Sequence, residues 1–144
     1  MNLRHALAAG AVLAASLALA TPAEARQASA SCWGGPTVTD YKGRTFSTST
    51  CPTWIQTSVL DQASLPGAET TGVLFPGDNW MVCQRKSGEN PQYGGGRNNY
   101  WLYTQGDTSR IHGGWGWIPA TSVSYGGDYQ AIPGVRICPA DFYG

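Results

Sequence analysis

The feature that most constrains the fold is a series of short β-favouring runs separated by clusters of turn residues. After residue 31, no apolar repeat at helical spacing continues for long enough to build an amphipathic helix. Glycine, proline, asparagine and aspartate interrupt the chain between the runs, for example at residues 75–78, 94–96 and 126–128. This pattern predicts an all-β sandwich or barrel. The expected strands are Ile55–Asp61, Thr70–Phe75, Asn79–Arg85, Asn99–Thr104, Gly114–Pro119 and Gly134–Cys138.

The N-terminal residues have the pattern of a secretory signal peptide. Arg4 precedes an apolar run from Ala6 to Ala20, which is shorter than the roughly 20 residues that a membrane-spanning helix needs. Ala23-Glu24-Ala25 then offers a small-residue cleavage site. We therefore expect a signal peptide over residues 1–25 and a secreted, extracellular mature chain without a membrane anchor. The alternatives are cleavage at Ala18-Leu19-Ala20 or Ala28-Ser29-Ala30, or an uncleaved anchor.

All four cysteines lie in the expected mature chain, at Cys32, Cys51, Cys83 and Cys138. In an oxidising compartment an even number of cysteines favours disulfides, and four cysteines allow three pairings. We favour Cys32–Cys51, which closes a local loop, and Cys83–Cys138, which joins a central strand to the C-terminus. A metal site is the alternative, but the sequence has no C-x-x-C pair, and His112 is the only histidine after the signal. We expect no metal and no cofactor.

Length and charge narrow the possible classes further. A chain of 144 residues has room for one domain of ordinary size. Lys+Arg 9 against Asp+Glu 9 gives a net charge of +0, which lacks the basic character of a general binder of nucleic acid or anionic membranes. Abundant aromatic residues argue against disorder. We expect a monomer in which residues 26–54 form a disulfide-stapled N-terminal extension on a domain that spans residues 55–144.

Three motifs occur in a fixed order in the centre of the chain. Residues 71–84 are TGVLFPGDNWMVCQ, residues 99–104 are NYWLYT, and residues 114–123 are GWGWIPATSV. In this order they resemble a bacterial SH3-like (SH3b) domain, and the chain looks most like the secreted, disulfide-bearing SH3b proteins of actinobacteria. The resemblance covers roughly Ile55 to Cys138. It implies a small SH3-like β-barrel and a role in binding cell-wall peptidoglycan.

Two of the expected strands are rich in aromatic residues. Strand alternation predicts that Trp101 and Tyr103 share one face, and that Trp115 and Trp117 share one face of the other strand. We expect some of these rings to reach solvent, because a small barrel lacks room for all of them. Exposed rings stack on flat ligands, and asparagine side chains both donate and accept hydrogen bonds.

The expected ligand-binding surface therefore consists of Asn98, Asn99, Tyr100, Trp101, Tyr103, Trp115 and Trp117. The order of residues in the SH3b pattern implies that Trp101 and Trp117 are structural. It leaves Trp115, Tyr100 and Tyr103 as the better candidates for exposure.

The sequence offers few groups for catalysis. Glu89, Arg97 and His112 have the residue types of a small nuclease or hydrolase, which needs acid–base and phosphate-binding groups. The other carboxylates that lie beside turn glycines are expected to serve turn structure. The first hypothesis is therefore a secreted, non-enzymatic module that binds peptidoglycan or another extracellular protein or glycan. The alternatives are an inhibitor or toxin that makes contact through the loop from Lys86 to Asn98, or an enzyme that uses the three residues above.

Overall fold

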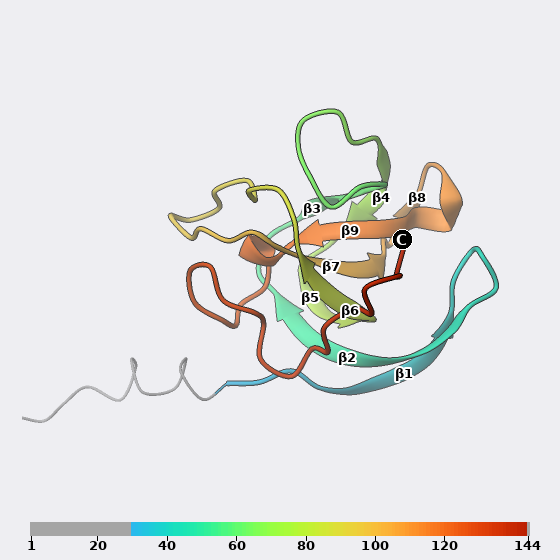
Figure 1. The fold of residues 1–144 in the computed structure, drawn as a ribbon, viewed down its shortest axis with the longest axis horizontal. Helices are drawn as coiled ribbons and strands as arrows, with labels where there is room; N and C mark the ends of the chain where they lie inside the picture. The colour runs from blue at the N-terminus through green and yellow to red at the C-terminus, as the bar shows by residue number, and fades with distance from the viewer. Residues whose placement is uncertain (1–29, 144) are drawn as a thin grey trace, which may run out of the picture.

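The structure is a computed structural model that describes residues 30–143. The expected signal peptide, residues 1–25, lies outside these residues. Within residues 30–143 the chain forms strands and two short 3₁₀ helices, and no helix there is long and apolar enough to span a bilayer (Figure 1). The elements are β1 (Trp33–Thr39), β2 (Thr45–Thr53), β3 (Thr57–Leu60), β4 (Thr70–Leu74), β5 (Gly77–Met81), β6 (Cys83–Lys86), β7 (Tyr100–Gln105), β8 (Thr108–Ser109), η1 (His112–Gly114), β9 (Trp115–Pro119) and η2 (Ala120–Ser122).

The strands form two antiparallel sheets, which are joined where β5 passes into β6. The first sheet has the order β1-β2-β5, and the second has the order β6-β7-β9-β3-β4-β8. Val82 lies between β5 and β6, and its backbone N–H donates to the carbonyl of Tyr103 at 2.8 Å. In Figure 1 the β1–β2 hairpin curves beneath the larger sheet. The fold is all-β, as the turn-interrupted runs predict, although the pairing of the described strands closes neither sheet into a barrel.

The expected strands agree with most of this arrangement. Four of the runs correspond to β3, β4, β7 and β9, while the run Asn79–Arg85 is divided between β5 and β6 at the bend. The N-terminal extension supplies β1 and β2, and β2 pairs with β5 from Ser49 opposite Met81 to Thr53 opposite Gly77. Residues on both sides of position 55 therefore build one sheet together.

Both disulfides join the cysteines that the sequence favoured. Cys32 pairs with Cys51, and Cys83 pairs with Cys138. The first closes the β1–β2 hairpin near its open end, and the second fixes the C-terminal segment to the start of β6. The described part of the chain contains no free cysteine.

The expected strand Gly134–Cys138 is wrong. This segment has no strand, and Ile137 makes only an isolated parallel bridge to Gln84. The buried Gln84 holds the segment through its amide: its Nε2 donates to the carbonyls of Ile132 and Val135, and its Oε1 accepts from the N–H of Ile132. The β-favouring run here is thus held by the side chain and backbone of Gln84 and by a disulfide, instead of by a continuous strand ladder.

Each face of the large sheet is covered by its own apolar core. Leu102 of β7 and Ile118 of β9 belong to the first core, together with Leu74, Met81 and Val123. The aromatic side chains on the opposite faces of β7 and β9 form the second core. Two cores are possible because the β1–β2 hairpin and the C-terminal segment cover a face that a sheet of this size usually leaves to solvent.

Candidate ligand-binding groove

Four of the five rings on the expected surface are buried and Tyr100 is half-buried, so the expectation of exposure is wrong for Tyr103 and Trp115. Trp101 and Tyr103 are fully buried, and Trp115 and Trp117 are 4% and 1% exposed. The expectation that Trp101 and Trp117 are structural agrees with this burial. The other two rings, Tyr103 and Trp115, were expected to be exposed, and their burial needs a physical reason.

That reason is a layer of side chains from distant parts of the chain. The ring of Phe142 contacts Tyr103 and Trp117, with centroids 5.1 and 5.9 Å apart. The ring of Trp80 lies 5.3 Å from that of Trp115. The guanidinium of Arg85 lies 4.5 Å above the centroid of Trp117. Strand alternation predicts which rings share a face, but it contains no information about a covering layer.

The asparagines of the expected surface have structural roles or are partly covered. Asn98 is buried, and its Nδ2 donates to the carbonyls of Gly127 and Gln130 at 3.3 and 3.0 Å. Its Oδ1 accepts from the N–H groups of Asn99 and Tyr100. Asn99 and Tyr100 are themselves half-buried. Asn98 is therefore a buried residue that joins the β6–β7 loop to the loop that follows η2.

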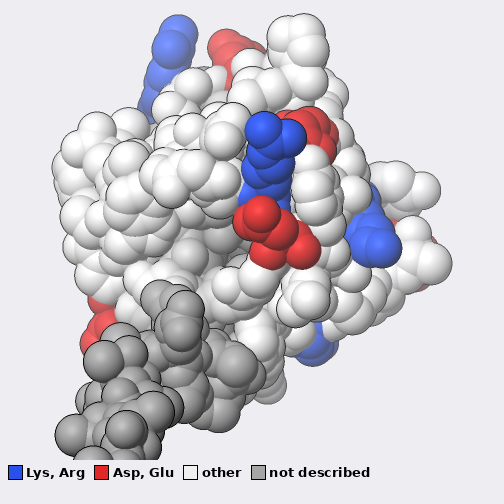
Figure 2. Space-filling view, turned by 90° about the vertical axis from the view of Figure 1, so that its left-hand side faces the viewer, with Lys and Arg blue, Asp and Glu red and all other residues white. Residues whose placement is uncertain are grey.

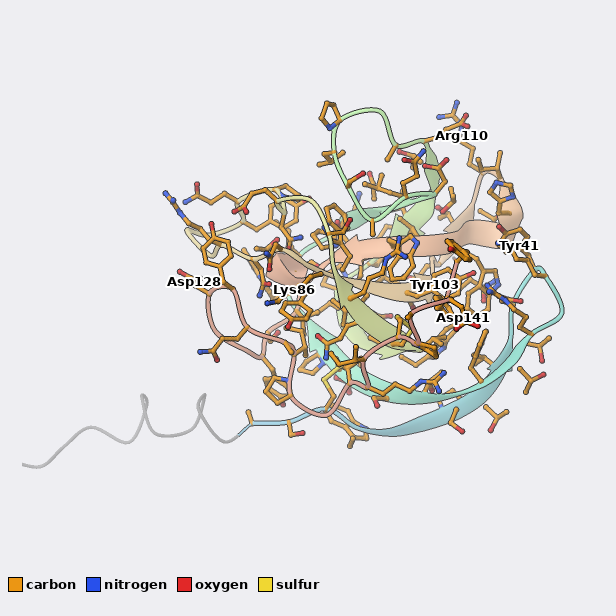
Figure 3. All side chains as sticks on the ribbon, viewed as in Figure 1. Tyr41, Lys86, Tyr103, Arg110, Asp128 and Asp141 are labelled. Atoms are coloured by element: carbon orange, nitrogen blue, oxygen red, sulfur yellow. A yellow bond between two sulfur atoms is a disulfide. The ribbon has the colours of Figure 1, made fainter. Side chains whose placement is uncertain are left out.

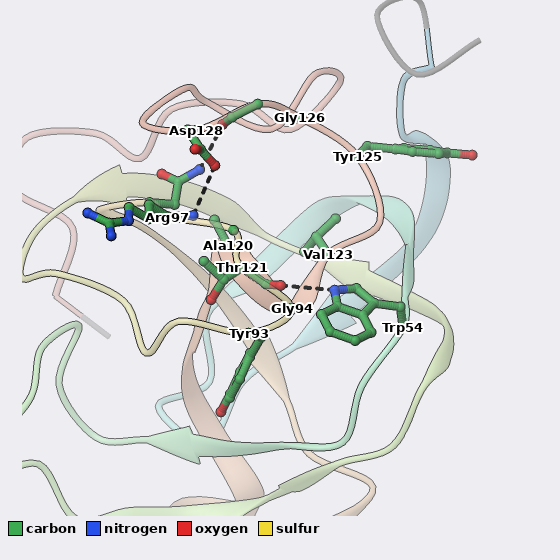
Figure 4. Close-up of a pocket in the computed structure, with 13 residues that line it drawn as sticks. Trp54, Tyr93, Gly94, Arg97, Ala120, Thr121, Val123, Tyr125, Gly126 and Asp128 are labelled. Carbon is green, nitrogen blue, oxygen red and sulfur yellow. Dashed lines mark hydrogen bonds between the residues drawn. The ribbon is translucent and has the colours of Figure 1, made fainter. Parts of the chain in front are cut away.

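A different aromatic group lines a cavity of about 360 Å³ between these two loops (Figure 4). Its lining includes Trp54, Tyr93, Arg97, Thr121, Tyr125 and Asp128. We call this cavity the aromatic groove. It lies between the end of β2, the β6–β7 loop, η2 and the loop that follows η2.

Trp54 is held in place by hydrogen bonds and by packing against Gly94, and about half of its surface is exposed. It follows β2 directly, and its backbone N–H donates to the carbonyl of Ser122 at 3.1 Å. Its indole Nε1 donates to the carbonyl of Thr121 at 2.9 Å, as Figure 4 shows. Gly94 approaches the ring so closely that a Cβ there would lie 3.0 Å from it. The side chain is nevertheless 46% exposed, so an oriented indole faces solvent beside the cavity.

One positively and one negatively charged residue, Arg97 and Asp128, lie on the opposite rim of the groove. The carboxylate of Asp128 accepts from the backbone N–H of Arg97 at 2.9 Å, and the N–H of Tyr129 donates back to the carbonyl of Arg97 at 3.0 Å. Figure 2 views the molecule from the side of these loops: charged side chains are sparse there, and blue and red groups lie next to one another. The groove is therefore lined by rings and neutral polar groups, with one cation and one anion at its rim.

The candidate catalytic residues do not meet in one site. His112 stacks on Tyr41 with ring centroids 4.7 Å apart, and Tyr41 lies at the end of the molecule opposite Asp128 (Figure 3). Arg97 is bonded to that same Asp128, so it is remote from His112. Glu89 accepts a hydrogen bond from the hydroxyl of Tyr129 at 2.7 Å, which raises the pKa of Tyr129. Residues 30–143 contain no group of three or more His, Cys, Asp or Glu arranged to hold a metal ion.

Sequence reasoning missed the rings that line the groove. Trp54, Tyr93 and Tyr125 lie outside the strands, and each is separated from the others by more than thirty positions in the sequence. The only local signal was the occurrence of single aromatics beside turn residues, at Tyr93-Gly94 and Tyr125-Gly126. Comparisons of the chain with protein-family models, curated proteins and solved structures gave no match.

Proposed function

We propose that the protein is a secreted, non-enzymatic binding module that recognises cell-wall peptidoglycan through the aromatic groove. The observation that carries the proposal is the oriented, half-exposed indole of Trp54 beside a cavity of about 360 Å³. An aromatic ring that is fixed by a hydrogen bond at its edge loses little freedom when a ligand stacks on it. This property favours binding over a structural role for the exposed face.

The composition of the groove supports a neutral, polar ligand with flat or ring-shaped groups. Tyr93 and Tyr125 also line the groove, and Thr121 adds a hydroxyl. Arg97 and Asp128 offer a donor and an acceptor at the rim. N-acetylated sugars present apolar ring faces for stacking, as well as hydroxyl and amide groups for such partners. Peptidoglycan is a polymer of these sugars and carries peptides.

The proposal includes an SH3-like arrangement of the central strands. The segments that carry the SH3b-like motifs are β4 to β6, β7 and β9, and β6, β7 and β9 are neighbours in one sheet. The isolated bridge between Thr53 and Val123 then links the end of β2 to the residues after η2. These contacts support the resemblance. The two disulfides support the proposal that the protein functions in an oxidising, extracellular environment.

The first test is retention of the protein on purified, insoluble cell walls. Trp54→Ala removes the exposed indole, and we expect it to weaken binding by at least about tenfold, the size typical of a lost aromatic anchor. Trp33→Ala is the matched control, because Trp33 is also 46% exposed but lies in β1 and does not line the groove. Trp33→Ala is expected to bind as the unmodified protein does.

Two results would contradict the proposal. One is equal retention of Trp54→Ala and Trp33→Ala, which would remove the groove from wall binding. The other is failure of the unmodified protein to bind walls at all. Thermal unfolding of both variants distinguishes loss of a contact from loss of the fold. Trp54→Phe, which keeps an aromatic ring, is expected to recover part of the affinity.

A further inference from the structure

Beside the aromatic groove lies a second cavity, of about 280 Å³, and the two have Tyr93 in common. Its lining includes Leu60, Leu65, Ala68, Pro91 and Pro119, and none of its lining residues is charged. We call it the apolar cavity. Leu65 is 47% exposed, so this apolar surface is open to solvent.

Tyr93 stands between the two cavities on the β6–β7 loop. Its hydroxyl lies 3.4 Å from Oγ1 of Thr57 on the side of the apolar cavity, and its carbonyl accepts from the N–H of Gly96 at 2.9 Å. Gly94 and Gly95 follow with φ of 56° and 85°, a backbone region that favours glycine. The turn built by these glycines places Tyr93 in the lining of both cavities.

The two cavities differ in chemistry. The lining of the aromatic groove includes one cation and one anion, while the apolar cavity combines aliphatic side chains and two prolines with uncharged hydroxyl groups. A charged ligand segment in the apolar cavity would lose hydration without gaining a partner of opposite charge, because no lining residue carries charge. The apolar cavity therefore suits an uncharged segment with small apolar side chains, and the aromatic groove suits a sugar.

From the shared lining residue Tyr93 and the different chemistry of the two cavities, we infer that the ligand is a glycopeptide whose sugar stacks on Trp54 and whose peptide crosses Tyr93 into the apolar cavity. The inference rests on the proposed function and names the ligand class of the same site. A chain that occupies both cavities gains contacts in each while it loses translational freedom only once. The linked ligand should then bind more tightly than either of its parts.

Isothermal titration with three soluble probes tests this inference. The probes are an N-acetylglucosamine tetrasaccharide, a free alanine-containing tripeptide, and an N-acetylglucosamine–N-acetylmuramic acid disaccharide that carries the same peptide. We expect the glycopeptide to bind at least tenfold more tightly than the tetrasaccharide or the peptide. Equal affinity of the tetrasaccharide and the glycopeptide would overturn the inference, because the peptide would then add nothing.

A variant that blocks the apolar cavity tests the same inference without comparing the affinities of different probes. Ser58 is exposed in β3 and lines the apolar cavity, so Ser58→Trp fills that cavity from its open side. Ser47→Trp is the matched control, because Ser47 is exposed in β2 and lines neither cavity. Ser58→Trp is expected to weaken glycopeptide binding at least tenfold and to leave tetrasaccharide binding unchanged.

The outcomes separate the inference from the proposed function. If Trp54→Ala weakens glycopeptide binding and Ser58→Trp does not, the aromatic groove binds the ligand and the inference fails. If neither variant changes binding, or if no probe binds, the proposed function fails as well. If Leu65→Ser reproduces the loss caused by Ser58→Trp while the thermal midpoint is unchanged, the apolar cavity is part of the site.

Discussion

At the scale of single residues, the arginine of an ion pair within the N-terminal hairpin also contacts the C-terminal segment. The carboxylate of Asp40 is fully buried and accepts from Nε of Arg44 at 2.8 Å and from the hydroxyl of Tyr103 at 3.3 Å. Arg44 also donates from Nη1 to the carbonyl of Tyr143 at 2.7 Å, and its guanidinium lies 4.9 Å from the centroid of Phe142. This cluster holds part of the layer that covers the second core.

The environment of Asp40 changes its pKa in two opposing ways. Burial acts to raise the pKa, but hydrogen bonds and the charge of Arg44 outweigh burial, so the pKa lies below its ordinary value of 3.8. Burial and the nearby charge of Asp40 raise the pKa of Tyr103 above its ordinary value. The folded state therefore favours an ionised Asp40 and a neutral Tyr103. For Asp40 this stabilisation is present above the unfolded pKa and is lost as pH falls through the folded pKa.

Replacement of Asp40 by asparagine should make stability less sensitive to acid. Asp40→Asn is expected to lower the free energy of unfolding at pH 7, because Arg44 then loses its charged partner. The difference from the unmodified protein should shrink as pH falls below about 4, where Asp40 begins to be protonated in the unfolded chain. Urea unfolding at pH 7 and pH 3 measures both values. Asp141→Asn, at an exposed position, is the control, and a difference that stays constant with pH would contradict this account.

At the scale of elements, β9 must contain a glycine where it crosses β3. A Cβ at Gly116 would collide with the carbonyl oxygen of Leu60, which pairs with Trp117 in the β3–β9 ladder. The doubled Gly-Trp motif is thus explained by packing: tryptophans face the second core, and the glycine between them lets two strand backbones approach.

Gly116→Ala should therefore destabilise the fold although it adds only a methyl group. We expect a loss of at least about 1–3 kcal/mol in the free energy of unfolding, the usual cost of overpacking. Gly34→Ala in β1 is the matched control, because a Cβ at Gly34 meets nothing within 4 Å. Chemical denaturation of the two variants gives the comparison. Equal stability of the two would show that β3 and β9 can move apart at low cost.

The elements also mark how far the sequence predicts the fold. Periodicity and turn residues identified β3, β4, β7 and β9, because each is a local pattern of alternation between turn residues. The bend at Val82 and the irregular segment from Gly134 to Cys138 could not be predicted in this way. Both depend on tertiary partners: Val82 on the carbonyl of Tyr103, and the C-terminal segment on the amide of Gln84.

At the scale of the whole molecule, the disulfide pairs could be predicted, but the location of the candidate site could not. Local loop closure favoured Cys32–Cys51, and that choice left Cys83 and Cys138 to pair with one another. The binding surface was predicted on β7 and β9 because these strands carry several aromatic residues close together in the sequence. Both strands lie inside the larger sheet, and most of their rings are buried. The groove is assembled from single aromatics in three separated connections, which only the folded chain brings together.

The most direct test of the central claim is a titration of the protein with soluble peptidoglycan fragments, followed through the indole N–H signals of its six tryptophans by NMR. The account predicts that the Trp54 signal shifts with saturation, while the signals of the buried Trp101 and Trp117 and of the equally exposed Trp33 stay in place. Saturable binding that leaves the Trp54 signal unchanged would contradict the account.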